Sequence, residues 1–501
     1  MYFLGIDLGT SAVKIILMNE AGEVVDGVSK EYPIYYPQPG WSEQTPEDWW
    51  NATKDGIREL IVKTGVKNED IKAIGLSGQM HGLVVLDENN QVLMPAILWN
   101  DQRTQEECDY ITRTLGKERL TKYTGNKALT GFTAPKILWV KKHRPEVYKK
   151  IKHILLPKDY IRFKLTGEYA TDVSDASGTL LFDVKNRRWS KDMLDALDIP
   201  YDWMPKSYES TEITGYITKE AADLTGLKEG TIVVGGGGDQ ASGAVGTGTV
   251  KSGIVSVALG TSGVVFASQD KYVVDEENRL HSFCHANGKW HVMGVMLSAA
   301  ACLKWWVDEI NNFGKESVTY DDLLGEAERV KAGSGGLIFL PYLMGERTPH
   351  SDPYARGCFI GLNMTHNRGH MTRAILEGVA FGLRDSLEII KGLNIPVNEV
   401  RVSGGGAKSK LWRQILADVF GVRVDMVNAT EGPAFGAAIM AAVGYGVFKD
   451  VEEACERIIR VTESVYPVGE DIEQQYNEKY KLYKDLYYLL KDTFKKISES
   501  D

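Results

Sequence analysis

The chain has 501 residues, of which 43% are hydrophobic and 25% are charged, and these ordinary globular proportions exclude long disordered or fibrous segments. A length of 501 residues exceeds what one hydrophobic core organises and indicates two large domains or three smaller ones. The formal net charge is −10 and no basic block is present, so we expect no binding to nucleic acid.

The cysteines and the apolar runs predict a cytoplasmic protein. Five cysteines lie far apart and form no CxxC pair, which is typical of reduced thiols rather than of a structural zinc site (Cys108, Cys284, Cys302, Cys358, Cys455). Asp7 falls where a secretory signal needs its apolar stretch. The longest apolar run, "VMGVMLSAAACL", is shorter than the roughly 20 residues that cross a bilayer, so no membrane association is expected.

The first hundred residues alternate between predicted strands and helices. "YFLGIDLGTSAVKIILM" predicts a hairpin, in which an apolar strand ends at Asp7 and a Gly-Thr-Ser turn leads into a second strand over 12–18. Residues 46–64 have apolar residues at helical spacing, with Pro46 at the position where a missing N–H costs nothing. "IKAIGLSGQMHG" then predicts a buried strand that ends at Gly78. This alternation continues along the chain and predicts an α/β fold.

Two segments recur, which predicts an internal duplication. "IDLGTSAVK" at 6–14 returns as "VALGTSGVV" at 257–265, and "NEDIKAIGLSG" at 68–78 is echoed by "NEVRVSGGG" at 398–406. The second copy of the hairpin has Ala258 where the first has Asp7. We therefore expect two duplicated domains, 1–246 and 247–501, joined in the glycine-rich stretch 235–253.

Four glycine-containing turns follow predicted strands and are candidate phosphate sites. Such turns let backbone N–H groups approach anionic oxygens, and Thr and Ser add hydroxyl donors. Two hairpins related by duplication would hold a polyphosphate from both sides. The pattern matches neither a P-loop nor a dinucleotide-binding glycine motif. The candidate ATP-binding residues are Gly9, Thr10, Ser11, Lys14, Gly260, Thr261, Ser262, Gly404, Gly405, Gly406 and Ala407.

Two aspartates beside these turns are the candidate catalytic residues. Asp7 is suited to hold Mg²⁺, which keeps several waters and takes only one or two carboxylates. Asp239, which follows "VVGGGG", is suited to accept the proton of a phosphate acceptor. The residue chemistry leaves alternatives: Asp7 as a turn cap, and Asp239 as a helix N-cap before "QASGAVG". The glycines before Asp239 are either a linker or, as we expect, bare backbone facing a ligand, where a side chain would stand between the acid and the phosphate.

Polar residues at the end of the third strand suggest where a sugar binds. Gln79 and His81 follow that buried strand, a place where α/β proteins commonly bind ligands. "LWNDQRT" offers Trp99 as an apolar wall and Asn100 and Asp101 as hydrogen-bonding groups. His81 as an ordinary surface histidine and Asp101 as the partner of a neighbouring arginine remain alternatives. Near the C-terminus, tyrosines at helical spacing predict a helix over 471–498 that packs on the second domain.

Two long patterns connect the chain to a known family. "GFTAPKILWVKKH" at 131–143, with Lys136 and Trp139, and "GCFIGLNMTHNRGHMTRAILE" at 357–377 match its two diagnostic segments in order. The chain resembles, from end to end, the FGGY carbohydrate kinases of the actin, sugar kinase and Hsp70 superfamily. This resemblance implies duplicated ribonuclease H-like domains around a central cleft, ATP and Mg²⁺, a small-molecule sugar substrate, and a homodimer.

Within the family, "GQMHG", "ILWNDQRT" and "FLPYLMGERTPH" are most similar to kinases that act on D-xylulose. The glycerol-specific branch has an Arg-Glu pair in place of Met80-His81. The resemblance implies that Met80 and His81 contact the sugar on the first domain, that ATP binds on the second, that Asp239 is the base and that Asp7 serves the metal and the phosphates. Together with Gln79, Trp99, Asn100, Asp101 and Asp239, these two residues make up the candidate sugar site. Two departures are Gly235, where relatives often have another small residue, and Gln240, where many have Asn. The alternatives are a kinase for L-ribulose, a ketohexose or a polyol, a non-catalytic sugar or nucleotide sensor, and an actin-like or Hsp70-like ATPase.

Overall fold

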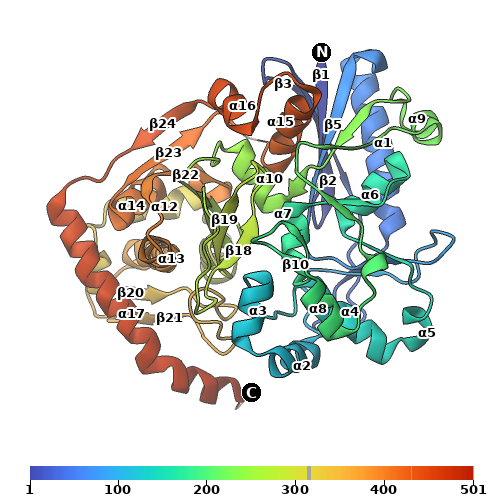
Figure 1. Ribbon diagram of the computed structural model, residues 1–501. Coiled ribbons are helices and arrows are strands. Elements are labelled where there is room, and N and C mark those ends of the chain that lie inside the picture. The colour runs from blue at the N-terminus through green and yellow to red at the C-terminus, as the bar shows by residue number, and fades with distance from the viewer. Residues whose placement is uncertain (313–316, 430, 500–501) are drawn as a thin grey trace.

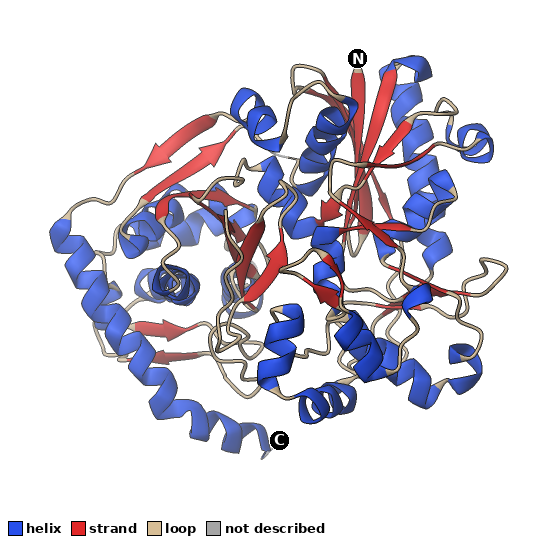
Figure 2. Ribbon diagram, in the orientation of Figure 1, coloured by secondary structure: helices blue, strands red, loops and turns tan. Residues whose placement is uncertain are grey.

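The computed structural model describes residues 1–312, 317–429 and 431–499. Within those ranges the chain folds into two domains, each built on a seven-stranded mixed sheet, and the two lie side by side (Figure 1). We call them the N-terminal and C-terminal domains. Helices flank the strands of both, and no helix of the described chain combines the length and apolarity needed to cross a membrane (Figure 2).

The N-terminal sheet contains the predicted hairpin. The strand order is β13 (Ile213–Tyr216), β14 (Ile232–Val234), β5 (Ile71–Gly78), β1 (Tyr2–Leu8), β2 (Ala12–Asn19) and β3 (Val24–Glu31), and β15 (Gly237–Gly238) pairs with the end of β5. The β1 and β2 strands form the predicted hairpin, whereas β5 runs parallel to β1. Three strands therefore bring their carboxyl ends to the same edge of the sheet.

The C-terminal sheet repeats this arrangement. Its order is β18 (His281–Cys284), β19 (Trp290–Met296), β17 (Gly263–Gln269), β16 (Gly253–Leu259), β22 (Val397–Ser403), β23 (Arg423–Val427) and β24 (Val461–Val465). The β16 and β17 strands form the second hairpin, and β22 runs parallel to β16 as β5 does to β1. Both recurring sequence segments thus occupy equivalent strands, which confirms the predicted α/β fold class and its duplication.

The helices begin and end where the sequence provides the usual signals. In α1 (Pro46–Thr64), Pro46 stands in the first turn with two acids, and Gly65 ends the helix at φ 63°, which confirms the predicted span. The other helices are α2 (Gln105–Leu115), α3 (Lys117–Thr124), α4 (Thr133–His143), α5 (Pro145–Tyr148), α6 (Pro157–Thr166), α7 (Val173–Ala176), α8 (Lys191–Leu197), α9 (Lys219–Thr225), α10 (Asp239–Gly246), α11 (Ala300–Trp305), α12 (Tyr320–Glu328), α13 (Arg368–Gly392), α14 (Lys410–Phe420), α15 (Pro433–Tyr445), α16 (Val451–Ile458) and α17 (Glu470–Glu499).

The short strands form two-stranded ladders outside the main sheets. They are β4 (Glu43–Gln44) with β7 (Ala96–Ile97), β6 (Val84–Leu86) with β8 (His153–Leu155), β9 (Ala170–Asp172) with β12 (Lys206–Tyr208), β10 (Phe182–Asp183) with β11 (Arg188–Trp189), and β20 (Ile338–Leu340) with β21 (Cys358–Ile360). Several of these ladders carry the loops that reach the functional site.

The α15 helix belongs to the second half of the sequence but covers the first sheet. In Figure 1 this red-orange helix lies beside the blue β1, and its alanines share a buried cluster with Phe3, Ile16 and Ala73. The contact is backbone to backbone, because a Cβ at Gly75 would lie 1.9 Å from the carbonyl oxygen of Ala437. Small residues on both sides therefore let α15 pack directly on the sheet.

Replacing Gly75 with alanine tests this packing. We expect Gly75→Ala to lower the free energy of unfolding by about 3 kcal/mol or more, because the clashing atom is backbone and the whole helix must shift. Gly325→Ala is the matched control, since nothing lies within 4 Å of a Cβ there and alanine favours its helix by about 0.5–1 kcal/mol. Urea denaturation compares the two variants, and equal stabilities would contradict the close packing.

The C-terminal helix packs on the C-terminal domain, as predicted. Four tyrosines of α17 form its buried stripe (Tyr476, Tyr480, Tyr483, Tyr487). Two of their hydroxyls donate to buried acids of α13: Tyr476 to Glu377 at 2.9 Å and Tyr480 to Asp385 at 2.6 Å. Figure 1 shows α17 running along the outside of this domain to the C-terminus.

Candidate active site

Asp7 and Asp239 meet at the carboxyl edge of the N-terminal sheet. Asp7 in β1 and Gly237 in β15 both pair with Ser77 of β5, from its two sides. Neighbouring strands are about 4.8 Å apart, so the two aspartates, one on each flank of β5, face the same small space. Gly238 is the N-cap of α10 and Asp239 its first residue, so Asp239 is not the helix N-cap that the sequence left as an alternative.

Burial makes both carboxyl groups reluctant to ionise. It raises the pKa of Asp7 to about 6, although the hydrogen bond of Ser77 and the charge of Lys14 act in the opposite direction. Burial, and then the negative charge of Asp7, raise the pKa of Asp239 to about 7, against hydrogen bonds from Gln240. An acid with a pKa close to neutrality accepts and returns a proton at physiological pH, as a general base requires.

Neighbouring backbone atoms of the protein explain why glycines precede Asp239. A Cβ at Gly235 would lie 2.4 Å from the carbonyl oxygen of Glu209, and one at Gly236 would lie 1.9 Å from that of Leu76. Gly236 also has a φ of 67°, which favours glycine. Our expectation that this backbone is bare in order to face a ligand is therefore wrong. The linker alternative is wrong too, because the run ends in the paired strand β15.

A cavity of about 640 Å³ in the C-terminal domain brings two of the predicted phosphate turns together. Gly260 and Thr261, after β16, face Gly405 and Gly406, after β22. Nothing lies within 4 Å of a Cβ built on Gly405, so the backbone there borders open space. Ser262, Gly404 and Ala407 belong to the same turns but not to the cavity wall. The full lining is Leu259, Gly260, Thr261, Ala300, Ala301, Leu303, Lys304, Tyr320, Asp321, Leu324, Gly405, Gly406, Lys408, Ser409 and Trp412.

Two helices that no sequence pattern marked as part of a site, α11 and α12, complete this cavity. The amide of Ala300 in α11 donates to the carbonyl of Gly260, and that of Ala301 donates to the carbonyl of Thr261. These bonds fix the second hairpin turn against α11. Tyr320 and Asp321 add the first turn of α12. The only sequence signal was the run of small residues before Cys302, which we interpreted as an apolar stretch.

A side chain at Gly405 tests the nucleotide assignment. We expect Gly405→Leu to raise the KM for ATP at least about ten-fold, because leucine fits the protein but fills ligand space. The KM for the sugar should change less than two-fold, since the residues predicted to bind the sugar lie in the other domain. Gly392→Leu is the control, as its Cβ is equally free but exposed at the end of α13. An unchanged KM for ATP in Gly405→Leu would contradict the assignment.

The first hairpin turn lies outside that cavity and is tied to the sugar-side loops. The hydroxyl of Thr10 accepts the indole N–H of Trp99 at 3.0 Å, and the carbonyl of Thr10 accepts from Gln44 at 2.7 Å. Gln79 is 1% exposed and donates to the same Gln44 at 2.9 Å. Gly9 and Ser11 flank Thr10 in this turn, and Lys14 pairs with Glu431 of the C-terminal half at 2.5 Å.

His81 is held in one orientation by its neighbours. Its backbone has a φ of 69°, and its carbonyl accepts from the buried ammonium of Lys136 and from Thr133, both at 3.0 Å. Its Nδ1 lies 2.6 Å from the carbonyl of Gly178, which can only accept, so Nδ1 carries the proton. Burial lowers the pKa of His81 to about 3, so the ring is neutral and Nε2 is an acceptor. This arrangement differs from the surface histidine that the sequence left as an alternative.

Met80 and the Trp99 loop form the rest of this region. Met80 is 5% exposed, and its sulfur lies 2.9 Å from a Cβ built on Gly238, next to Asp239. Trp99 is 39% exposed, and Asn100 has a buried Oδ1 without a hydrogen-bond partner. Such a partly open aromatic face beside an unpaired amide oxygen is suited to a polyhydroxylated ligand.

Asp101 forms the ion pair that the sequence left as an alternative. Its carboxylate is fully buried and accepts from Arg103 at 2.7 Å and from the amide of Ser42 at 2.6 Å. The Arg103 guanidinium also pairs with Glu43 at 2.8 Å and lies 3.7 Å from the ring centroid of Trp41. Both oxygens of Asp101 are thus engaged within the protein and support the loop that carries Trp99.

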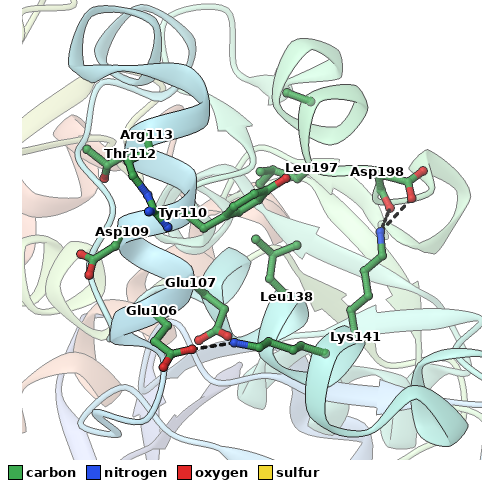
Figure 3. A pocket seen from close by; sticks show the side chains of 12 residues that line it. Glu106, Glu107, Asp109, Tyr110, Thr112, Arg113, Leu138, Lys141, Leu197 and Asp198 are labelled. Atoms are coloured by element: carbon green, nitrogen blue, oxygen red, sulfur yellow. Dashed lines mark hydrogen bonds and ion pairs between the residues drawn. The ribbon is translucent and has the colours of Figure 1, made fainter.

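A larger groove lies elsewhere and has none of this chemistry. It has a volume of about 980 Å³ and runs between α2, α4 and α8 (Figure 3). Its walls include the exposed ion pairs of Lys142 with Glu106 and of Lys141 with Asp198. None of the predicted site residues lines it. Solvated pairs of this kind are ordinary surface, so the site is placed at the two aspartates instead.

The donors at Asp7 suit a divalent cation with several waters. The Oδ1 of Asp7 is buried and has no hydrogen-bond partner among the described residues, although a buried carboxylate oxygen is normally satisfied. Among the described residues no group of three or more His, Cys, Asp or Glu side chains forms a closed metal site. One or two carboxylates at an open site are the usual protein contribution to Mg²⁺, so the residues fit this ion.

Comparisons with known proteins identify the family of the chain. The model of the "FGGY family of carbohydrate kinases, N-terminal domain" matches residues 2–246, and that of the C-terminal domain matches 255–445. The chain is 43% identical over 98% of its length to the xylulose kinase of Bacillus subtilis, covering 97% of it, and 45% identical over 90% to that of Escherichia coli, covering 92%. The crystal structure of a "xyloylose kinase" from Brucella ovis superposes with a TM-score of 0.90 at 38% identity, covering 98% of this chain and 99% of that one. The family predicted from the sequence is confirmed: the chain belongs to the FGGY family of carbohydrate kinases.

Proposed function

We propose that this enzyme transfers the γ-phosphate of ATP to D-xylulose and releases D-xylulose 5-phosphate and ADP. The observation that carries the proposal is the pair Asp7 and Asp239 at one sheet edge, with the pKa of Asp239 raised to about 7. Relatives named as xylulose kinases, with 43% and 45% identity over most of the chain, support the substrate. We assign the sugar to residues 1–246 and the nucleotide to residues 247–501.

In the proposed reaction the terminal hydroxyl of the sugar attacks the γ-phosphorus of ATP. The new P–O bond forms as the bond to the β–γ bridging oxygen breaks, and Asp239 takes the hydroxyl proton. General-base assistance of this kind contributes roughly 10²- to 10⁴-fold to the rate. The remaining catalysis is positioning of the two substrates, because phosphoryl transfer needs little other help from the protein.

The residues around the aspartates are proposed to position both substrates. Nε2 of His81 accepts a sugar hydroxyl, Trp99 provides an apolar wall, and Asn100 and Met80 complete the pocket, while Gln79 and Asp101 hold these loops in place. The turns at Gly260 and Gly405 bind the nucleotide. Asp7 would hold Mg²⁺, directly or through water, and the bound ion would supply positive charge to the phosphates. We also propose that the protein is cytoplasmic, forms a homodimer and does not bind nucleic acid. Sedimentation velocity measures whether the purified chain is a dimer.

An ADP-release assay across a panel of sugars tests the proposed substrate. We expect kcat/KM to be highest for D-xylulose among ketopentoses, ketohexoses, glycerol and aldoses at equal concentrations. A higher value for L-ribulose or a ketohexose would replace the substrate but keep the kinase. No ADP release with any member of the panel would favour a sensor, and release independent of sugar would favour an actin-like ATPase. The phosphate position is read from the NMR spectrum of the product.

The coupling of the two aspartates predicts a pH effect. Asp239 acts as a base only when ionised, so kcat/KM should rise with pH up to about 7 and then level off. Because the charge of Asp7 is one cause of the raised pKa of Asp239, Asp7→Asn should move this acid limb to lower pH, besides lowering the rate. The measurement is kcat/KM for the sugar between pH 5 and 9 at constant Mg²⁺. An acid limb at the same pH in both proteins would contradict the coupling.

A further inference from the structure

The strand that ends at Asp239 is held at almost every backbone group. The amides of Gly235 and Gly236 donate to the carbonyls of Glu212 and Ser210, at 2.9 Å and 2.8 Å. On the other side, the carbonyl of Gly235 accepts from the guanidinium of Arg162 at 2.5 Å. These bonds fix where the glycine run enters the site.

One side chain holds the last amide before the catalytic residue. The amide of Gly238 donates to Oγ of Ser174 at 3.1 Å, and this hydroxyl donates in turn to Oδ2 of Asp172 at 2.5 Å. Oδ1 of Asp172 pairs with Lys158 at 2.8 Å. Asp172, Ser174 and Lys158 are all 0% exposed. A line of buried polar groups therefore runs from a charged cluster to the residue that precedes Asp239.

The segment that carries Ser174 also contacts the sugar loop and the other domain. Three residues further on, Oγ of Ser177 accepts the amide of Cys284 in β18, across the domain boundary, at 3.0 Å. The carbonyl of the next residue, Gly178, accepts a hydrogen bond from Nδ1–H of His81. Within this short segment each contact has its own residue: Ser174 contacts the catalytic strand, Ser177 the C-terminal sheet and Gly178 the ring of His81.

We propose that Ser174 is a positioning residue for phosphoryl transfer: its hydroxyl, oriented by Asp172 and Lys158, holds the Gly238 amide and thereby aims the carboxylate of Asp239. The inference rests on the proposed role of Asp239 as the base. Ser174→Ala leaves the Gly238 N–H buried without the hydroxyl acceptor that it has in wild type. Because an unpaired buried N–H is costly, the end of the strand shifts from its wild-type position. A misplacement of about 1 Å at a reacting group costs up to about 10²-fold in rate.

The test compares S174A with S177A in the purified full-length chain. Ser177→Ala removes an equally buried hydroxyl from the same segment, but that hydroxyl makes no contact with the glycine strand. We expect S174A to lower kcat by about 10- to 100-fold with the KM for ATP within about two-fold of wild type, and S177A to keep kcat within about two-fold. Amide hydrogen exchange over 233–241 should accelerate in S174A alone. Equal kcat values for the two variants would overturn the proposal.

Two further variants separate the possible failures. If S174A does not fold, Ser242→Ala replaces it, because the Ser242 hydroxyl donates to the carbonyl of Gly237 at 3.2 Å and holds the same strand from α10. We expect S242A to lower kcat by about 3- to 10-fold, and an unchanged kcat would overturn the proposal. Asp239→Ala is measured in parallel. If it is inactive while S174A is normal, only the positioning role fails; if it is active, the base assignment fails and the positioning role fails with it.

Discussion

Replacing Asp239 with alanine should lower kcat for sugar phosphorylation by about 10²- to 10⁴-fold while the enzyme still binds ATP. The expectation follows from two features: Asp239 leaves a rigid glycine strand beside Asp7, and burial together with Asp7 raises its pKa to about 7. The KM for ATP should change less than about three-fold, because the turns proposed to bind the nucleotide lie in the other domain. Steady-state kinetics with D-xylulose measures both constants.

The stability of this variant distinguishes lost chemistry from lost folding. Folding raises the pKa of Asp239, so the ionised form of this side chain lowers the free energy of unfolding. In wild type this destabilisation is fully present above about pH 7, and it diminishes as the pH falls. At pH 8 the Tm of Asp239→Ala should therefore equal or exceed that of wild type, and the difference should shrink towards pH 5. An active Asp239→Ala variant would exclude Asp239 as the base. If the variant is inactive and its Tm is much lower than that of wild type, the lost activity is due to misfolding.

Replacing Lys158 with methionine should destabilise the N-terminal domain by about 3–5 kcal/mol, the usual result of breaking a buried ion pair. The ammonium of Lys158 lies 2.7 Å from Asp159, 2.8 Å from Asp172 and 3.0 Å from Asp175, and all four side chains are 0% exposed. Burial alone would lower the pKa of Lys158, but the three carboxylates outweigh it and hold the pKa above its ordinary value. Methionine has similar length and leaves these charges facing one another, with Arg162 as the remaining cation.

The matched control is Lys141→Met on the surface. Lys141 pairs with Asp198 at the same distance of 2.7 Å, but Asp198 is 92% exposed, and the denaturation midpoint should hardly change. A pH series adds a second check. Burial raises the pKa of Asp175 well above its ordinary value, so this group takes up a proton on acidification, and the deficit of Lys158→Met should diminish as the pH falls. If Lys158→Met and Lys141→Met lowered the free energy of unfolding equally, burial of the ion pair would not be the cause of the destabilisation.

Local patterns in the sequence were enough to predict the fold class and the turns that line one cavity. The repeated Leu-Gly-Thr-Ser turn identified two equivalent hairpins, and strand ends with glycines located turns that border the 640 Å³ cavity, because both signals lie within about ten residues of chain. Apolar spacing and Pro46 sufficed for α1. In each case a contiguous segment determines its own conformation, so a single sequence carries the information.

Contacts between distant segments were beyond the reach of those patterns. Lys158 finds Asp172 and Asp175 only after α6 and α7 have folded together, and no periodicity marks a buried ion cluster. The glycines before Asp239 have the right residue type for ligand contact, but the carbonyls that require them come from residues 209 and 76. Asp101 likewise looked like a ligand because its burial was unknown. The residue type limits the interactions that a side chain can form, and tertiary packing determines which of these interactions it forms.

The position of α15 on the N-terminal sheet has a consequence for biosynthesis. The face of β1 and β5 that it covers leaves the ribosome hundreds of residues before Pro433–Tyr445 is made. Until then Phe3, Ile16 and Ala73 have no native cover, and the first half of the chain displays an apolar sheet face that is prone to association. Emergence of Pro433–Tyr445 from the ribosome, rather than completion of residue 246, is the event that finishes the N-terminal core.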